Sequence, residues 1–152
     1  MPTEPPASTQ SAQAAVESLY ARDPASQALG IEILEVSAGR VRIAMTIRAE
    51  MLNGYGMCHG GVVFAFADTA FAFACNSHGE PMVAAGASIE FLAPTAAGER
   101  IGAIATEILR TDRFGIYDVV VAASSGGVIA HFRGRCARFR PPPPLHVKDH
   151  HE

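Results

Sequence analysis

The stretch CHGGVVFAFADTAFAFACNSHG, residues 58–79, decides the fold. Almost every side chain between Gly60 and Cys75 is Gly, Ala, Val or Phe, and a single carboxylate, Asp68, interrupts the run. The alternation of Phe and Ala has the period of a β-strand, but the run is longer than the ~3–10 residues of most strands. Alanine is the best helix former, and glycines with polar residues punctuate both ends, as helix termini require. We therefore predict a buried helix over this run.

Segments with strand periodicity flank this helix. Alternation predicts a hairpin over residues 31–45 that turns at Ala38-Gly39, and residues 9–22 predict a short amphipathic helix ended by Asp23-Pro24. A helix that is apolar all round must be buried on all sides. We therefore predict an α+β fold, with a long central helix wrapped by a curved antiparallel sheet of five to six strands. Beyond the helix, the strand-like segments are MVAAGASIEFLAP, ERIGAIATEILRTD, FGIYDVVVAAS and GVIAHFRGRCARF.

The composition fits one domain. Of 152 residues, 49% are apolar and 18% charged, which supplies a sizeable core. We expect a flexible N-terminus over residues 1–8, a single domain over 9–139 and a Pro-rich, His-containing disordered tail over 140–152. The formal net charge of −3 argues against a nucleic-acid partner.

Membrane insertion and export are not expected. The apolar run is shorter than the ~20 residues of a membrane-spanning helix and carries Asp68. The first residues lack the basic and apolar regions of a secretory signal. Three cysteines without a short-spaced framework favour reduced thiols, and we expect a cytoplasmic location.

The spacing of Asn53, His59 and Asp68 resembles a known family. Asn53 lies six residues before the HGG sequence, and Asp68 lies nine residues after His59. With the segments NGYGMCHGGVVFAFADTAFAFACNSHG and IEFLAPTAAGERI, the chain resembles the hotdog-fold acyl-CoA thioesterases, most closely their phenylacetic acid degradation branch, over residues 28–139. The resemblance implies hydrolysis of phenylacetyl- and hydroxyphenylacetyl-type CoA thioesters to free acid and CoA. It implies no cofactor beyond the coenzyme A of the substrate.

Gly60 and Asp68 would carry the chemistry. Backbone N–H groups at a helix N-terminus lack acceptors and lie at the positive end of the dipole. Gly60 can therefore polarise a thioester carbonyl, although Gly60 and Gly61 can equally serve tight packing. Asp68 would be the nucleophile or the general base that activates water. The alternative is a structural acid bonded to the backbone.

Gly60 and Asp68 of one chain cannot serve the same carbonyl. Eight residues separate them by about 12 Å along a helix, whereas a reacting group must lie within ~3 Å of both. Two antiparallel helices across a two-fold axis would bring Gly60 of one subunit to Asp68 of the other, an arrangement that the family uses. We therefore expect a homodimer or, as the resemblance implies, a dimer-of-dimers homotetramer.

Three further polar residues, His59, Asn53 and Thr69, lie near Gly60 and Asp68 in the sequence. The resemblance assigns to His59 the orientation of the loop and the substrate carbonyl, but a capping role is equally consistent with its position. Asn53 is either a turn residue of an Asn-Gly pair or a polar contact to Asp68 or the substrate. The Thr69 hydroxyl is a candidate to offset the desolvation of Asp68, and we group Thr69 with Gly61 among the substrate-binding residues.

Arginines of the C-terminal half are candidates for the CoA phosphates, because arginine suits phosphate recognition. We select Arg113 and Arg133 among them, although solvated strand faces explain any single arginine as well. The Phe and Ala side chains around Asp68 would line an apolar acyl pocket, while most of them serve the core. No metal site is expected, because Cys58-His59 and the pair Cys75 and His78 would lie at opposite ends of the helix.

Two other functions remain as alternatives. A non-catalytic acyl-CoA-binding or regulatory hotdog protein would keep the pocket without needing Asp68. A hotdog dehydratase would carry its catalytic histidine in a different loop context and its acid further along the helix. Retention of Gly60 and Asp68 favours the thioesterase over both.

Overall fold

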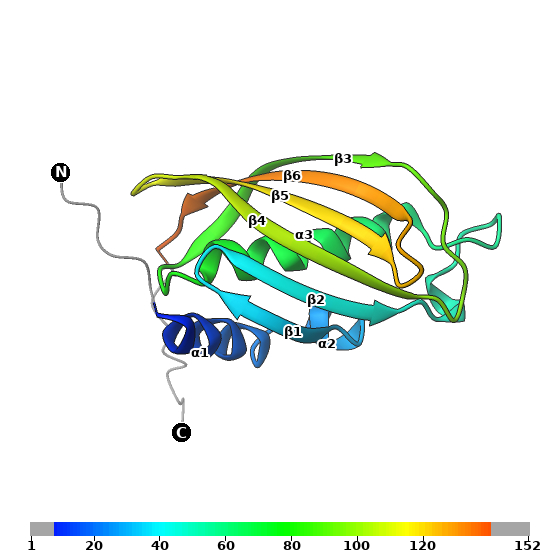
Figure 1. The fold of residues 1–152 in the computed structure, drawn as a ribbon, viewed down its shortest axis with the longest axis horizontal. Helices are drawn as coiled ribbons and strands as arrows, with labels where there is room; N and C mark the ends of the chain where they lie inside the picture. The colour runs from blue at the N-terminus through cyan, green and yellow to red at the C-terminus, as the bar shows by residue number, and fades with distance from the viewer. Residues whose placement is uncertain (1–7, 141–152) are drawn as a thin grey trace, which may run out of the picture.

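The apolar run forms helix α3, Gly60–Asn76, as predicted. His59 is its N-cap, and the helix lies in the middle of the molecule under the strands (Figure 1). The computed structural model describes residues 8–140. Apart from Ser8 and Arg140, the predicted flexible N-terminus and Pro-rich tail lie outside the described residues.

Six antiparallel strands form one sheet that curves around α3 (Figure 1). The strand order is β1-β2-β4-β5-β6-β3, so β1 and β3 are the two edges. The predicted α+β architecture, a central helix wrapped by a curved antiparallel sheet, is confirmed. The strands are β1 (Glu32–Ser37), β2 (Arg40–Thr46), β3 (Met82–Phe91), β4 (Arg100–Arg110), β5 (Phe114–Ala123) and β6 (Val128–Arg138).

The core lies between α3 and the concave face of the sheet. Alternate residues of β4 and β5 point inward, as their period of two predicts. Phe71 of α3 packs its ring against Tyr117 and Phe132, with centroids 5.8 and 5.7 Å apart. This contact fixes the rotation of α3 against the sheet, and with it the direction of the side chains on the opposite helix face.

The N-terminal helical segment differs from the prediction. Helix α1 covers Thr9–Tyr20, and Asp23-Pro24 does not simply end it but begins a second helix, α2 (Pro24–Ala28). Asp23 is the N-cap of α2 and accepts the N–H of Ser26 at 3.0 Å. The signal was present in the sequence, because Asp is a favoured N-cap and Pro a favoured first helical residue. A short 3-10 helix, η1 (Ala49–Met51), precedes the loop before α3.

Helix α3 is not buried on all sides within one chain, contrary to the prediction. The buried positions face the sheet or the N-terminal helices, as Phe73 does against Tyr20, whereas one stripe of α3 stays partly or fully exposed. The spacing of three and four residues places this stripe on a single face. An apolar helix therefore presents an uncovered face. The stripe consists of Gly61, Ala65, Asp68, Ala72 and Asn76.

Gly134 on β6 is required by the close approach of α3. A Cβ at this position would lie 2.8–2.9 Å from ring atoms of the buried Phe71. We expect Gly134→Ala to lower the free energy of unfolding by about 1–3 kcal/mol, the usual cost of overpacking. The matched control is Gly127→Ala, whose Cβ would meet nothing within 4 Å. Equal denaturant midpoints for the two variants would contradict this packing.

Candidate active site

The N-terminus of α3 presents a free backbone donor. The Nδ1 atom of His59 accepts the N–H of Gly61 at 2.9 Å, and the His59 carbonyl accepts those of Val62 and Val63. The N–H of Gly60 has no hydrogen-bond partner among residues 8–140. Gly60, and not Gly61, therefore offers a donor at the positive end of the helix dipole.

His59 has the capping role that the sequence left as one of two alternatives. Because Nδ1 accepts a hydrogen bond, the ring proton of neutral His59 lies on Nε2. His59 as a whole is exposed. A role of His59 toward the substrate carbonyl stays a prediction.

A cavity of about 330 Å³ lies next to the free N–H of Gly60. Its wall is mostly apolar. It is formed chiefly by the loop before α3, the start of α3, the end of β3 and the segment after β3. An apolar group held beside Gly60 would find mostly apolar neighbours in this cavity. The cavity is lined by Asn53, Met57, Cys58, Gly60, Val63, Phe91, Leu92, Ala93, Pro94, Thr95 and Ile129.

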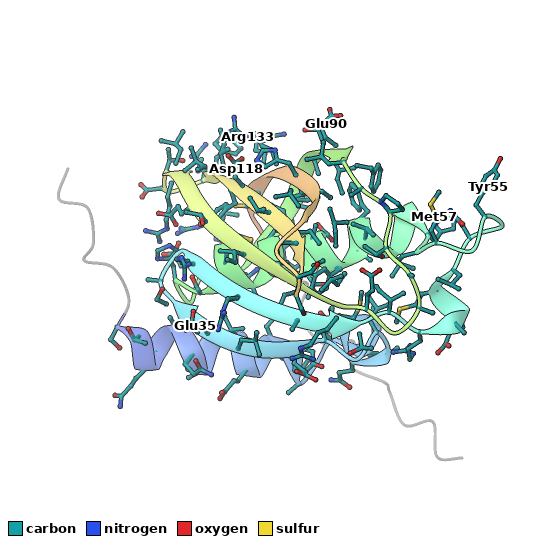
Figure 2. The ribbon with its side chains drawn as sticks, turned by 45° about the vertical axis from the view of Figure 1, so that its right-hand side comes forward. Glu35, Tyr55, Met57, Glu90, Asp118 and Arg133 are labelled. Atoms are coloured by element: carbon teal, nitrogen blue, oxygen red, sulfur yellow. The ribbon has the colours of Figure 1, made fainter. Side chains whose placement is uncertain are left out.

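Asn53 shapes the loop and also lines the cavity. Its Oδ1 atom accepts the N–H groups of Tyr55 at 2.9 Å and Met57 at 3.3 Å, as a turn-forming Asn does. This turn carries Tyr55 and Met57 outward at one end of the molecule (Figure 2). The turn role is therefore observed, and a contact from Asn53 to Asp68 or the substrate stays a prediction.

Asp68 lies half-buried on the uncovered stripe of α3. Burial raises the pKa of the Asp68 carboxyl above its ordinary value, and the Asp23 carboxylate at the start of α2 raises it further. Both effects disfavour the ionised form. Asp23 was not among the expected site residues, because its position depends on the packing of α2 against α3.

Thr69 does not support Asp68 as expected. Its hydroxyl donates to the carbonyl of Ala65 at 2.8 Å and lies 3.1 Å from the Ser26 hydroxyl. Ser26 in turn donates to Asp23 at 2.6 Å. Thr69 and Ser26 are both buried, so the contact between their hydroxyl oxygens joins α2 to α3 beside Asp68. Thr69 thus positions the N-terminal segment, and its predicted contact with substrate is a separate, untested prediction.

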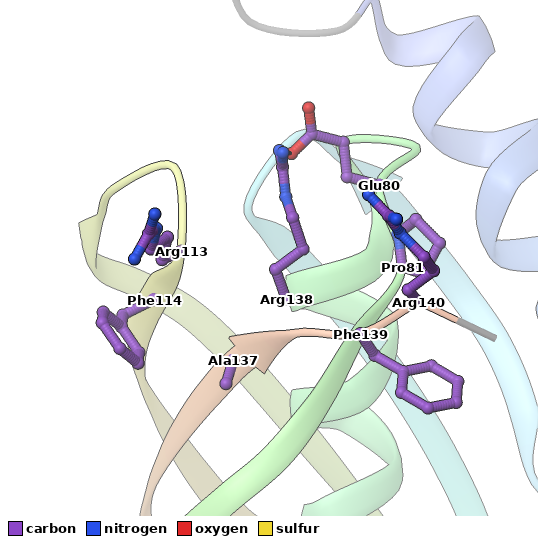
Figure 3. Close-up of a pocket in the computed structure, with 8 residues that line it drawn as sticks. All are labelled: Glu80, Pro81, Arg113, Phe114, Ala137, Arg138, Phe139 and Arg140. Atoms are coloured by element: carbon purple, nitrogen blue, oxygen red, sulfur yellow. Dashed lines mark hydrogen bonds and ion pairs between the residues drawn. The ribbon is translucent and has the colours of Figure 1, made fainter. Parts of the chain in front are cut away.

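Arg113 lies in a second cavity, of about 570 Å³, beyond the C-terminal end of α3 (Figure 3). Arg138 and Arg140 line the same cavity, together with the rings of Phe114 and Phe139. Among residues 8–140, the one carboxylate in its wall is Glu80, which pairs with Arg138. The cavity therefore has an excess of positive charge beside aromatic surface.

Arg133 is on the outside of the sheet and already has a partner. Its Nε and Nη2 atoms bind the two oxygens of Asp118 at 2.6 and 2.9 Å (Figure 2). Arg135 lies on the same face of β6, with its guanidinium carbon 5.7 Å from the ring centroid of Phe114. The structure thus separates Arg133 from both cavities, because neither wall includes it.

Comparison with known proteins identifies the family. A family model described as the thioesterase superfamily matches residues 55–130, half of the chain. The chain belongs to the thioesterase superfamily. It is 40% identical to the acyl-coenzyme A thioesterase PaaI of Escherichia coli K12 over 121 residues, which are 80% of this chain and 86% of that protein.

Solved structures agree with this assignment. The structure of the E. coli PaaI protein from the phenylacetic acid degradation operon has a TM-score of 0.86 and 37% identity, covering 88% of this chain and 97% of that one. A point mutant of the phenylacetic acid degradation protein PaaI from Thermus thermophilus has a TM-score of 0.74 and 37% identity, covering 77% of this chain and 100% of that one. The predicted hotdog fold, PaaI-type family and thioester hydrolase class are confirmed.

Residues 8–140 contain no membrane-spanning helix, no cluster of metal ligands and no disulfide. Within residues 8–140, none of the helices has the length and apolar character needed to cross a membrane. In the same part of the chain, no three His, Cys, Asp or Glu side chains are grouped as a metal site. All three cysteines are buried and free of disulfides.

The raised pKa of Asp68 predicts the pH dependence of this thioesterase. If the carboxylate form reacts, the acid limb of kcat/KM lies at higher pH than an ordinary aspartate would place it. Asp23→Asn removes one cause of the shift and preserves a good N-cap, so we expect this limb to move to lower pH. A pH–rate profile measures the displacement. An unchanged limb in Asp23→Asn would contradict the influence of Asp23 on Asp68.

The same pKa predicts that Asp68 costs stability. An acid whose folded-state pKa is raised contributes stability below its unfolded pKa and loses it as pH rises through the folded pKa. We therefore expect Asp68→Asn to melt at a higher temperature than wild type at neutral pH. The difference should vanish in acid, which thermal melts across the pH range would reveal. A lower melting temperature at neutral pH would show that Asp68 is a stabilising structural acid.

Proposed function

We propose that the protein hydrolyses acyl-CoA thioesters, with small aromatic acyl groups of the phenylacetyl and hydroxyphenylacetyl type as substrates. The observation that carries the proposal is the N–H of Gly60, which has no partner among residues 8–140 and lies at the edge of a mostly apolar cavity of about 330 Å³. A thioester carbonyl at Gly60 would gain most from this donor as negative charge develops on its oxygen. The relative that shares 40% identity is named an acyl-coenzyme A thioesterase.

Asp68 supplies the attack, either as the nucleophile or as the base that activates water. Asp68 of the same chain is about 12 Å along the helix from Gly60, so we propose that the partner subunit's Asp68 completes the site. The uncovered stripe of α3 contains Asp68 and is the face a second helix would cover. Edge strand β3 is exposed along nearly its whole length, which offers a second surface for the same dimer.

The arginine cavity would take the CoA phosphates of a substrate bound across two subunits. In a dimer with antiparallel α3 helices, Asp68 of one chain would lie opposite Gly60 of the other chain. The arginine cavity of the first chain would then lie past its Asp68, toward the C-terminal end of its α3. From Asp68 to the helix end at Asn76 is about 12 Å, a span suited to the extended arm of CoA. Arg113 and Arg138 are the proposed phosphate ligands, and Phe114 offers stacking surface. Arg133 lies outside both cavity walls, so this proposal does not use it.

Release of free CoA thiol from a panel of acyl-CoA esters tests the proposal. The panel contains phenylacetyl-CoA, its ring-hydroxylated forms, acetyl-CoA and a long-chain ester. We expect turnover with preference for the aromatic members. Binding of acyl-CoA without thiol release from any member would favour the non-catalytic alternative. A dehydratase would instead change the absorbance of 3-hydroxyacyl-CoA without releasing thiol.

The oligomeric state is tested separately by sedimentation velocity at assay concentration. We expect a dimer or a tetramer built from dimers. A monomer that still turns over substrate would overturn the shared site while leaving thioester hydrolysis itself intact.

A further inference from the structure

We propose that Phe91 determines the acyl specificity of this thioesterase, because its exposed ring contacts an aromatic acyl group in the cavity beside Gly60. The inference rests on the proposed function and adds a specificity-determining residue to it. With this contact, the enzyme favours an aromatic acyl group over a saturated ring of similar size.

The ring of Phe91 lies against the residue whose N–H would bind the thioester carbonyl. A Cβ built on Gly60 would lie 3.2 Å from the Cζ atom of this ring, and 3.5 and 3.7 Å from its two Cε atoms. The tip of the ring therefore points at Gly60. Phe91 and Gly60 also line the same cavity, so an acyl group whose carbonyl lies at the Gly60 N–H would start beside the ring.

A ligand in this cavity can reach the ring. Phe91 is 55% exposed, so more than half of its surface is open to contact. Among residues 8–140, no other aromatic ring pairs with Phe91, whereas Phe64, Phe71 and Phe73 of α3 each pair with another ring. Aromatic rings attract one another in offset-stacked or edge-to-face arrangements. The ring of Phe91 is therefore free to make such a pair with a ligand.

The backbone around Phe91 is fixed to the sheet. Phe91 is the last residue of β3 and lies opposite Ala130 of β6. The next two N–H groups, those of Leu92 and Ala93, donate to the carbonyl of Ile129 at 2.8 and 3.2 Å. The ring thus projects from a hydrogen-bonded strand end, and a regular element holds a specificity group more precisely than a loop does.

Phe91 contributes something that the rest of the cavity wall does not. Among residues 8–140, it is the one aromatic residue in this wall, and its apolar neighbours, such as Met57 and Leu92, are aliphatic. Aliphatic side chains favour any apolar acyl group by burying its surface, whereas an aromatic pair adds attraction beyond burial. We therefore expect wild type to favour phenylacetyl-CoA over cyclohexylacetyl-CoA by about three- to tenfold in kcat/KM.

The experiment measures thiol release from these two esters by wild type, Phe91→Leu and Phe91→Met. Both substitutions keep an apolar side chain and remove the ring. We expect each to lower the ratio of kcat/KM, phenylacetyl over cyclohexylacetyl, by about threefold or more relative to wild type. Comparing ratios cancels the intrinsic reactivity of each ester. Thermal melts establish that the variants fold, and either one suffices if the other does not.

The matched control is Leu92→Ala, which shortens the neighbouring exposed side chain in the same wall without touching a ring. We expect it to lower turnover of both esters to a similar extent and to leave the ratio unchanged. A fall in the ratio as large as in Phe91→Leu would assign the preference to the cavity as a whole and overturn the role of Phe91.

Three further results would also overturn the inference. They are a wild type without preference for phenylacetyl-CoA, an unchanged ratio in the Phe91 variants, and equal losses on both esters in those variants. In each case wild-type hydrolysis would stand, so the proposed function would survive. Absence of wild-type hydrolysis of every ester would defeat the proposed function and, with it, this inference.

Discussion

Asp68→Asn is expected to lower kcat by about 10²–10⁴-fold, the usual contribution of a catalytic acid or base. Asparagine preserves the size of the side chain but neither attacks a thioester nor accepts a proton from water. KM should change little, because the role of the carboxylate lies in the reaction step. Thiol release from the best ester of the panel measures the loss. Activity close to wild type would eliminate Asp68 from the mechanism.

The same variant tests whether two subunits share a site. Asp68→Asn mixed with a subunit defective at Gly60 would form heterodimers in which one of the two sites has both groups intact. Random exchange would restore about one quarter of wild-type activity, since half the dimers are mixed and each has one working site. Refolding or co-expressing the two variants together provides the mixture. No recovery above the separate variants would place both groups in one chain.

Gly60→Pro is expected to lower kcat by about 10²–10³-fold, the cost of losing one oxyanion donor. Proline removes the free N–H and is otherwise favoured at the first position of a helix. His59 already has the extended backbone, φ −60° and ψ 133°, that a residue before proline adopts. The substitution should therefore leave α3 intact, which circular dichroism would establish.

Gly60→Ala is the matched control. A Cβ at this position would lie 3.2 Å from the ring of Phe91, so alanine introduces the crowding of proline but keeps the N–H. A far smaller loss in alanine than in proline would assign the effect to the donor. Equal losses would assign it to the contact with Phe91 and contradict the oxyanion role.

Much of the fold could be predicted from local pattern. The length and apolar character of residues 60–75 predicted α3, and alternation in the later segments predicted the strands, because periodicity reflects which face is buried. Helix α2 was missed although Asp23-Pro24 is a good helix start. The pattern was interpreted only as an end of the preceding helix.

The site was predicted in part. Gly60 and His59 could be placed, because a helix N-terminus exposes its N–H groups wherever the helix packs. Thr69 was assigned a contact that the structure gives to Ser26 and Ala65, and Arg133 pairs with Asp118. Ser26 and Asp118 lie on other elements, so no local sequence pattern predicts these two contacts, whereas the bond from Thr69 to Ala65 is a local one within the helix.

By itself, the sequence determined the long apolar helix, the order of strands along the chain, and the spacing that puts Gly60 at the helix start and Asp68 at its middle. These follow from local geometry, since a helix fixes the separation and rotation of its residues. Only the tertiary structure decided which N–H remains free among residues 8–140, which face of α3 stays uncovered there, and that Thr69 meets Ser26 and Arg133 meets Asp118. Those properties depend on which distant groups meet, and hydrogen bonds and burial between them exist only once the chain is packed.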